Sequence, residues 1–284
     1  QNQTGFYRRK SLLFLLFGVN DLQEAAMKIH QVYTESELRN FTYLIELEDG
    51  SALVIDPWDA GEVNRLLHQW QLSLRAIINT HEHWDHIQGN PELVAEHSCE
   101  VWAHSNGQGK VPGLSRMLKA GELIDLGSGV QLRVLDTPGH TYAHLCFLML
   151  EQGVEVAVFT GDTLFNAGVG HCRSGDVDSL YQTIAEQFHC LDDNVRVYPG
   201  HDYLENNLRF TLSVEPDNRQ AQEWLPRAIA ADLTVAPLVT RIGDEREFNS
   251  FFRLANRQIR EGLNSVNATN KEVFIKLRSL RDKW

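Results

Sequence analysis

The segment from residue 81 to residue 86 carries the residue types that bind divalent metal ions in proteins. His81, His83 and His86 supply three imidazoles and Asp85 supplies a carboxylate, all within six residues. Neutral imidazole and ionised carboxylate are ligands that zinc and the neighbouring divalent metals accept. Since residues 81, 83 and 85 alternate while Asp85 and His86 are adjacent, one short segment can serve two metal ions. We therefore interpret it as a metal site, the alternative being a histidine-rich surface loop.

Polar residues of the same kinds follow other apolar runs along the chain. They come directly after predicted strands: Asp56, His81, Asp136 with His140, Asp162 and His201. In layered α/β folds the loops at the strand ends converge on one rim, where ligands bind. Flanking glycines permit tight turns that aim such side chains. The sequence therefore predicts one site built from several loops at one edge of the fold.

The elements that must position these residues alternate between short strands and helices. Beyond a first strand that begins near Met27, we expect strands at 41–47, 52–55, 75–78, 100–103, 130–135, 145–150, 156–159 and 195–198. Helical spacing predicts helices at 59–70, 90–96 and 178–188, the second capped by Asn90. After about residue 201 the pattern predicts helices at 206–214, 216–230 and 271–284, with irregular connectors at 235–237 and 241–249.

The bulk composition excludes several classes of protein. The chain has 284 residues, 43% hydrophobic and 23% charged, which suits a globular protein with one large and one smaller domain. A formal net charge of −12 argues against a nucleic acid or an anionic membrane as the main partner. The four cysteines form no Cys-x-x-Cys pair and are too few for a disulfide framework. We therefore expect a cytoplasmic protein that acts on a small molecule; no feature here specifies an oligomeric state.

The first 26 residues form an extension to this pattern. Arg8, Arg9 and Lys10 precede the apolar run 12–17, an arrangement similar to a secretory signal. The run is far shorter than the roughly 20 residues that span a bilayer, so no membrane span is expected. We interpret residues 1–26 as an upstream segment that packs as an extra helix or arm, with export as the alternative.

The metal-ligand residues resemble the motifs of the metallo-β-lactamase superfamily in order and spacing. These residues are His81, His83, Asp85, His86, His140, Asp162 and His201. Within that superfamily the chain is most similar to glyoxalase II, the hydroxyacylglutathione hydrolases, in its segments 160–165, 197–203, 206–210 and 215–218. The resemblance covers about residues 27–284. It implies an α/β fold: an αββα sandwich over 27–201 that binds the metals, and a helical substrate-binding domain over 202–284.

The resemblance also implies two divalent metal ions per chain. The ligands would be His81, His83 and His140 for one ion and Asp85, His86 and His201 for the other, with Asp162 bridging them. Two such ions lower the pKa of a shared water, so that a metal-bridging hydroxide would attack an S-acylglutathione thioester such as S-lactoylglutathione, a step in methylglyoxal detoxification. Asp85 and Asp162 would act as catalytic residues. Zinc is the expected metal, and iron and manganese suit the same ligands.

A second group of residues is implied in substrate recognition. By the same resemblance, Tyr203, Arg278 and Arg281 would contact glutathione, the two arginines from one face of a C-terminal helix. A solvated basic helix face is the alternative interpretation. The chain departs from the family after Gly170, where a basic and then an aromatic residue are usual. His171 and Arg173 stand there instead, and we expect them to supply donors to the substrate with a different geometry.

Two further residues are expected close to the metals without binding them. Asp56, at the end of a strand, is expected to orient a ligating imidazole through its other ring nitrogen, or alternatively to end the strand before Pro57. His144 is expected to be a hydrogen-bonded core histidine.

Other chemistries share the same motif residues. A glutathione persulfide dioxygenase would use one iron held by His81, His140 and Asp162. A thioester-binding sensor with little turnover is the other alternative. The helical C-terminal part and its two arginines favour the hydrolase.

Overall fold

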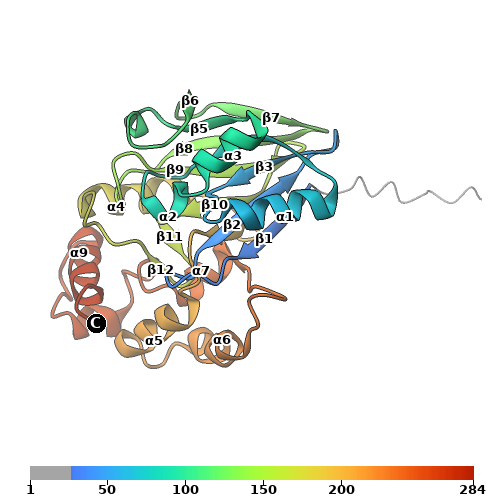
Figure 1. The fold of residues 1–284 in the computed structure, drawn as a ribbon. Coiled ribbons are helices and arrows are strands. Elements are labelled where there is room, and N and C mark those ends of the chain that lie inside the picture. The colour runs from blue at the N-terminus through green and yellow to red at the C-terminus, as the bar shows by residue number, and fades with distance from the viewer. Residues whose placement is uncertain (1–26) are drawn as a thin grey trace, which may run out of the picture.

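The computed structural model describes residues 27–284, so the extension at residues 1–26 lies outside the described part of the chain. Two six-stranded sheets face each other, and helices cover the outer face of each (Figure 1). This arrangement is the αββα sandwich that the sequence predicted. Within residues 27–284 no helix is long and apolar enough to cross a membrane.

The first sheet is built from the N-terminal strands. Its order follows the chain: β1 (Lys28–Tyr33), β2 (Phe41–Glu46), β3 (Ser51–Ile55), β4 (Ser73–Ile78), β5 (Glu100–His104) and β6 (Leu114–Leu118). The strands β1 to β3 are antiparallel, whereas β3 to β6 run parallel. Because alternate residues of a strand face opposite sides, Tyr43 and Ile45 point towards the second sheet while Leu44 packs against helix α1 (Ala60–Trp70).

The second sheet is built from later strands. Its order is β14 (Thr240–Arg241), β13 (Arg196–Pro199), β10 (Val154–Gly161), β9 (Leu145–Glu151), β8 (Val130–Asp136) and β7 (Leu123–Gly127). A two-stranded ribbon of β11 (Leu164–Phe165) and β12 (Gly168–Val169) follows β10. Since β10 and β13 are parallel, their C-terminal ends reach the same edge of the sheet.

The remaining helices cover the sheets and form the C-terminal part. They are α2 (Trp84–Ile87), α3 (Asn90–His97), the 3-10 helix η1 (Ser105–Gly107), α4 (Val177–Thr183) with the π-helical turn η2 (Ile184–Phe188), α5 (Leu204–Val214), α6 (Arg219–Ala230), α7 (Ile242–Phe248), α8 (Arg257–Gly262) and α9 (Asn270–Arg281). Side-chain caps fix several helix starts: Asp59 accepts from the Glu62 N–H, and Thr269 accepts from the Glu272 N–H. Helices α5, α6 and α9 gather beside one edge of the sandwich, α9 next to α4 (Figure 1).

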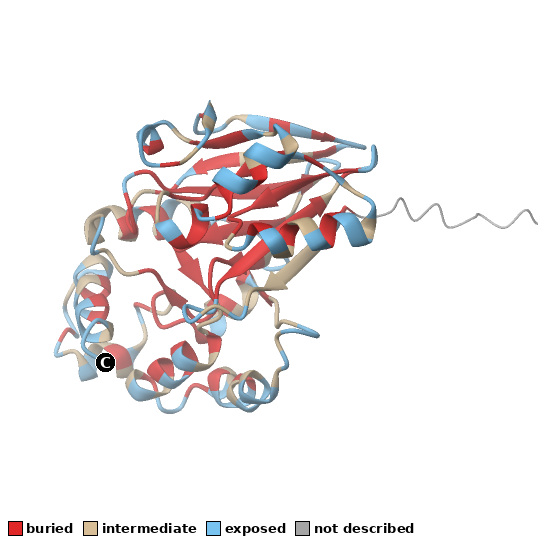
Figure 2. Cartoon of the chain, in the orientation of Figure 1, coloured by how far each residue is buried: buried red, intermediate tan, exposed pale blue. Residues whose placement is uncertain are grey.

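The hydrophobic core is divided into layers, one between the two sheets and one on the outer face of each. Apolar side chains from both inner faces, among them Phe41, Phe147 and Phe159, fill the space between the sheets. A second cluster of buried apolar residues lies on the outer face of the second sheet. It contains Leu148 of the sheet, residues of α4, and Phe274 of α9. The buried residues accordingly concentrate in the strands, and the outward sides of the helices are exposed (Figure 2). The sheets therefore form a rigid base for the loops at their edge.

The structure corrects the predicted elements in several places. Residues 241–249, expected to be irregular, form β14 and α7, where the Asp244 carboxylate accepts from the Arg241 N–H at the start of the helix. The strands β6 and β7 and the short helix α8 were not predicted; β6 and β7 are edge strands with alternate residues exposed, which weakens their apolar pattern. Asn90 is the first residue of α3 and not its cap, because Gly89 takes that position.

Candidate metal centre

Loops from both sheets bring the predicted ligands to one edge of the sandwich. His81 and His83 follow β4, and the short helix α2 carries Asp85 and His86. The remaining ligands follow β8, β10 and β13 of the second sheet: His140, Asp162 and His201. The four loops converge because each follows a strand that ends at this edge, as the sequence predicted.

Three imidazoles form one ligand cluster, called here the three-histidine cluster: His81, His83 and His140. Their facing atoms are His81 Nε2, His83 Nδ1 and His140 Nε2, with His83 Nδ1 lying 3.0 Å from the first and 2.9 Å from the last. The three atoms all lie within 4.8 Å of one another, a spacing that permits each to bind the same ion.

A second cluster, called here the aspartate cluster, combines Asp85, His86 and His201. The Nε2 atoms of His86 and His201 are 3.2 Å apart, and Asp85 Oδ2 lies 3.4 Å from each. All three side chains are buried. One carboxylate and two imidazoles make up this second set of three ligands.

Asp162 lies between the two clusters. Its Oδ2 is 3.5 Å from His140 Nε2 and 3.2 Å from His201 Nε2, while its Oδ1 is 3.4 Å from His86 Nε2. The Oδ1 atom is buried and accepts no hydrogen bond from any described residue. An unpaired buried carboxylate oxygen is costly unless a cation neutralises it. Together with the two clusters, this oxygen fits a pair of divalent metal ions that share one carboxylate.

The outward ring nitrogens of the aspartate cluster contact a buried carboxylate and a backbone carbonyl. His86 Nδ1 lies 2.9 Å from Asp56 Oδ2, and His201 Nδ1 lies 2.8 Å from the Leu38 carbonyl oxygen. The Asn40 amide donates to Asp85 Oδ2 at 3.0 Å. The predicted orienting role of Asp56 is thus matched by a contact. The carboxylate of Asp56 also accepts two hydrogen bonds from Thr80, which places it behind the ligands and not among them.

The three-histidine cluster has weaker outward partners. His81 Nδ1 lies 3.0 Å from the Thr80 hydroxyl, and His140 Nδ1 lies 2.8 Å from the His171 carbonyl oxygen. His83 Nε2 lies 3.1 Å from the hydroxyl of Ser174, an exposed residue. Two of these partners belong to the loop after β12, which the sequence analysis treated only as a substrate loop. Such contacts fix which nitrogen of each ring faces the metal position.

Burial and neighbouring charges set the protonation of the ligands. Burial, assisted by neighbouring imidazoles, holds the pKa of His81 well below its usual value, and burial lowers that of His140 to about 4 in spite of Asp162. Burial opposes ionisation of Asp85, but His86 and Asn40 hold the pKa of its carboxyl well below the usual range. Neutral imidazoles and an ionised carboxylate are the forms that bind divalent metals.

Two glycines leave room for the ligands. A Cβ on Gly200 would stand 2.4 Å from Asp162 Oδ1 and 2.8 Å from His86 Cε1. Gly161 has a φ of +46°, and a Cβ there would stand 2.5 Å from the Thr80 hydroxyl. Both residues must therefore be glycine for Asp162 to reach its place between the clusters.

Two predicted residues lie near the centre without entering either cluster. His144 is fully buried, lies 2.9 Å from the Thr137 hydroxyl and accepts from the Asp162 N–H at 3.1 Å, so it supports the bridging residue. Asp136, the last residue of β8, is half exposed; among the described residues its side chain pairs with His104 at 3.6 Å and with none of the ligands, so it does not join the site.

The predicted substrate residues flank the centre. The Tyr203 ring stacks on His201 with centroids 5.0 Å apart. His171 lies beside His140, with ring centroids 4.7 Å apart, and Arg173 and Arg278 line a cavity of about 340 Å³ between the loop after β12 and α9. The half-buried Arg281 donates to Asn207 Oδ1 at 3.3 Å. Arg278 is buried, and its Nη1 donates to the Val169 carbonyl oxygen.

Sequence reasoning missed Leu38, Asn40 and Ser174. Leu38 contributes only a backbone carbonyl, which carries no residue signature. Asn40 bonds to Asp85, 45 residues away, and Ser174 bonds to His83, 91 residues away, so no local pattern links the partners.

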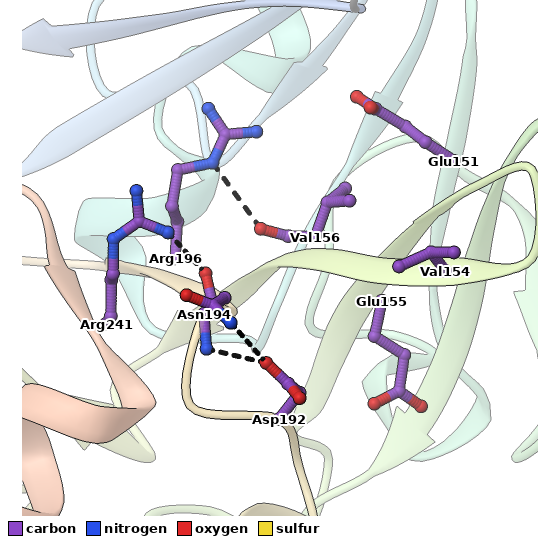
Figure 3. A pocket seen from close by; sticks show the side chains of 8 residues that line it. All are labelled: Glu151, Val154, Glu155, Val156, Asp192, Asn194, Arg196 and Arg241. Carbon is purple, nitrogen blue, oxygen red and sulfur yellow. Dashed lines mark hydrogen bonds between the residues drawn. The ribbon is translucent and has the colours of Figure 1, made fainter.

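A larger cavity, of about 500 Å³, contains none of these ligands in its lining, which Figure 3 shows. It is at the opposite ends of β10 and β13, beside Val154 and Arg196, whereas Asp162 and His201 follow the other ends of the same strands. Arg196 and Arg241 are register partners on adjacent strands and form one wall. None of the predicted site residues lines this cavity.

Comparison with known proteins gives two matching family models. Residues 37–201 match the metallo-beta-lactamase superfamily, and residues 202–284 match the C-terminus of hydroxyacylglutathione hydrolase. The chain is 42% identical to a hydroxyacylglutathione hydrolase of Polaromonas sp. and 43% identical to one of Nitrosococcus oceani, over 91% of this chain and 100% of each relative. The crystal structure of ETHE1 from Myxococcus xanthus is similar with a TM-score of 0.63 at 25% identity, covering 89% of this chain and 91% of that one.

Proposed function

Because the chain belongs to the metallo-β-lactamase superfamily and, within it, to the hydroxyacylglutathione hydrolases, we propose that it hydrolyses S-acylglutathione thioesters with two divalent metal ions. The observation that carries the proposal is the buried Oδ1 of Asp162, which accepts no hydrogen bond from any described residue and lies between two clusters of three ligands each. S-lactoylglutathione is the proposed substrate, with lactate and glutathione as products.

When bound, two divalent ions supply a water molecule of lowered pKa and positive charge for the developing oxyanion. The side chains of the two clusters would bind these ions and fix their positions. In the three-histidine cluster, burial keeps the imidazoles of His81 and His140 uncharged, and the aspartate cluster adds the carboxylate of Asp85 beside that of Asp162. Asp56 keeps the Nε2 atom of His86 facing inwards. No side chain is required to protonate the leaving group, because a thiol with a pKa near 8.5 departs as a thiolate.

We assign recognition of the glutathione part to residues on both sides of the centre. Burial raises the pKa of Tyr203, so its hydroxyl remains a hydrogen-bond donor. Arg281 is half-buried on α9, and Arg173 is exposed at the cavity beside α9, so both guanidinium groups are available to the substrate carboxylates. His171 adds a ring edge next to His140.

Three finer assignments complete the proposal. The boundary between the two domains is assigned to residue 201: the sandwich up to that residue binds the metals, and the C-terminal part with α5 to α9 binds the substrate. Zinc is the proposed metal, since imidazole and carboxylate ligands suit it, and iron or manganese would use the same residues. The cytoplasm is the proposed compartment, in keeping with four cysteines that are all unpaired.

The experiment combines metal analysis with two activity assays on the purified protein. We expect two divalent ions per chain and release of free thiol from S-lactoylglutathione. One iron per chain, together with oxygen uptake in the presence of glutathione persulfide, would instead establish a dioxygenase. Two ions per chain with thioester binding but no turnover would establish a sensor.

A further inference from the structure

Glu82 lies between the ligands His81 and His83 in the chain, but its carboxylate bonds to other residues. Its Oε2 accepts from the Thr141 hydroxyl at 2.9 Å, and its Oε1 accepts from Lys110 Nζ at 3.0 Å. The two imidazoles face each other, so the side chain between them in this extended segment points the other way. Glu82 thus serves a neighbouring segment and belongs to neither ligand cluster.

Thr141, the partner of Glu82, directly follows the ligand His140. It is fully buried, and its hydroxyl also accepts from the Ala143 N–H at 3.2 Å. Its carbonyl oxygen accepts from the Gly139 N–H at 3.0 Å. Thr141 is therefore part of the turn that carries His140, and a bond to its hydroxyl acts on that turn.

The bond between Glu82 and Thr141 joins loops that belong to different sheets. His83 follows β4 of the first sheet, whereas His140 follows β8 of the second. The three-histidine cluster needs ligands from both loops, with His83 Nδ1 and His140 Nε2 close enough to share one ion, as their separation of 2.9 Å permits. The relative position of the two loops therefore decides the geometry of this cluster.

Both partners of this bond are largely withdrawn from water. The side chain of Glu82 is 12% exposed, and Thr141 is buried. A hydrogen bond to an ionised acceptor is about twice as strong as a neutral one, and loss of the acceptor leaves the buried hydroxyl without a partner. Lys110 is 58% exposed, and exposed ion pairs contribute little to stability. The bond to Thr141 is therefore the stronger of the two contacts.

We propose that Glu82 is a positioning residue that holds His140 next to His81 and His83 by bonding the loop after β4 to the loop after β8 through Thr141. The inference rests on the proposed metal-dependent function, because the cluster that Glu82 stabilises is a ligand set of that function. It gives a role to a position among the ligands that itself binds no ion.

The test follows release of the two ions to a chelator, without substrate, from the full-length metal-loaded protein. For Glu82→Ala we expect one ion to leave about tenfold faster, as for loss of a group that orients metal ligands. Thr141→Val should accelerate the same ion at least as much, and adding Glu82→Ala should change nothing further, because the bond is already absent. Glu82→Gln keeps an oxygen that accepts from Thr141, so its release rate should stay within about threefold of wild type.

Lys110→Met is the matched control, because it removes the exposed partner of the same carboxylate. We expect both ions to leave at rates within about twofold of wild type. Asp56→Asn identifies the ion concerned, since Asp56 contacts His86 of the aspartate cluster. The ion that Glu82→Ala releases faster should be the other one.

Equal acceleration in Glu82→Gln and Glu82→Ala would overturn the proposal, because the charge of Glu82, and not its bond to Thr141, would then retain the ion. Wild-type release from Thr141→Val, or a further acceleration in the double variant, would overturn it as well. If Glu82→Ala does not fold, Thr141→Val and Thr141→Ser provide the comparison, and only the valine variant should release an ion faster. Since release is measured without substrate, the expected release rates together with absent thioester hydrolysis would refute the proposed function alone.

Discussion

The two ligand clusters of the metal centre contrast in what holds their side chains. The aspartate cluster is buried, and its outward atoms meet the carboxylate of Asp56, the amide of Asn40 and the backbone of Leu38, all before or between strands of the first sheet. In the three-histidine cluster His83 is partly exposed, and both His83 and His140 depend on the loop after β12.

This difference separates two sources of preorganisation. The aspartate cluster is oriented by groups close to the rigid sheets, including a charged one, whose hydrogen bonds are stronger than those of neutral partners. The three-histidine cluster is oriented by a hydroxyl and a carbonyl on the loop after β12. Changes in that loop should therefore reach one metal position and leave the other intact.

The largest effect is expected from Asp162, which belongs to both clusters. Asp162→Ala removes the shared carboxylate, so we expect metal content to fall below two ions per chain and thioester hydrolysis to drop by roughly 10³-fold. Asp136→Ala is the matched control, since Asp136 is the last residue of β8 but does not pair with the ligands. Elemental analysis and the hydrolysis rate check the result; full metal content in Asp162→Ala would contradict the bridging position.

A smaller, one-sided effect is expected from Asp56. Asp56→Asn keeps the shape but removes the negative charge beside His86 Nδ1, so the aspartate cluster should bind its ion about 10–100-fold more weakly. Chelator titration measures the two affinities. Asp59→Asn serves as the control, because asparagine caps α1 as well as aspartate does. If Asp56→Asn lowered the affinity for both ions equally, the proposed difference between the two clusters would be wrong.

A substitution of Ser174 tests the three-histidine cluster, and its expected effect on metal binding is smaller. Ser174→Ala removes the exposed hydroxyl near His83 Nε2, and we expect faster release of one ion by less than about tenfold, because water can replace the hydroxyl. The conservative variant Ser174→Thr should restore wild-type release. The comparison loses support if Ser174→Ala affects the ion that responds to Asp56→Asn.

The smallest effect on activity is expected from Glu245, a buried residue of α7 that accepts from the N–H of Ala167, between β11 and β12. Burial raises its pKa to about 8, although Thr240, Asn249 and Ala167 donate to it. Between about pH 4.5 and 8 the folded protein holds a proton that the unfolded chain releases, so the free energy of unfolding falls as pH rises through that window.

Glu245→Gln mimics the protonated carboxyl and should flatten this pH dependence, which amounts to roughly a few kcal/mol. Denaturant unfolding of both proteins with chelator present, at pH 5 and pH 8.5, isolates the difference. An unchanged slope would show that Glu245 is ionised in the folded state across this range.

The fold was predictable where its pattern is local. Strands such as β3 and β9 are buried along their length, and the helix α1 shows regular apolar spacing, so their residues indicate them directly. The edge strands β6 and β7 and the helix α7 were missed, because their stability comes from neighbours distant in the chain. The same distinction applies to the metal centre.

The sequence alone determined the ligand types, their grouping after strands and the family. These depend on residue identity and spacing, because few other arrangements satisfy so many imidazoles and carboxylates near one another. Only the tertiary structure decided how each ligand is held and what Arg278 contacts. His86 and His201 face each other across 115 residues, and Arg278 reaches Val169 across 109. Such contacts depend on how the layers pack, and packing brings together groups that share no local pattern.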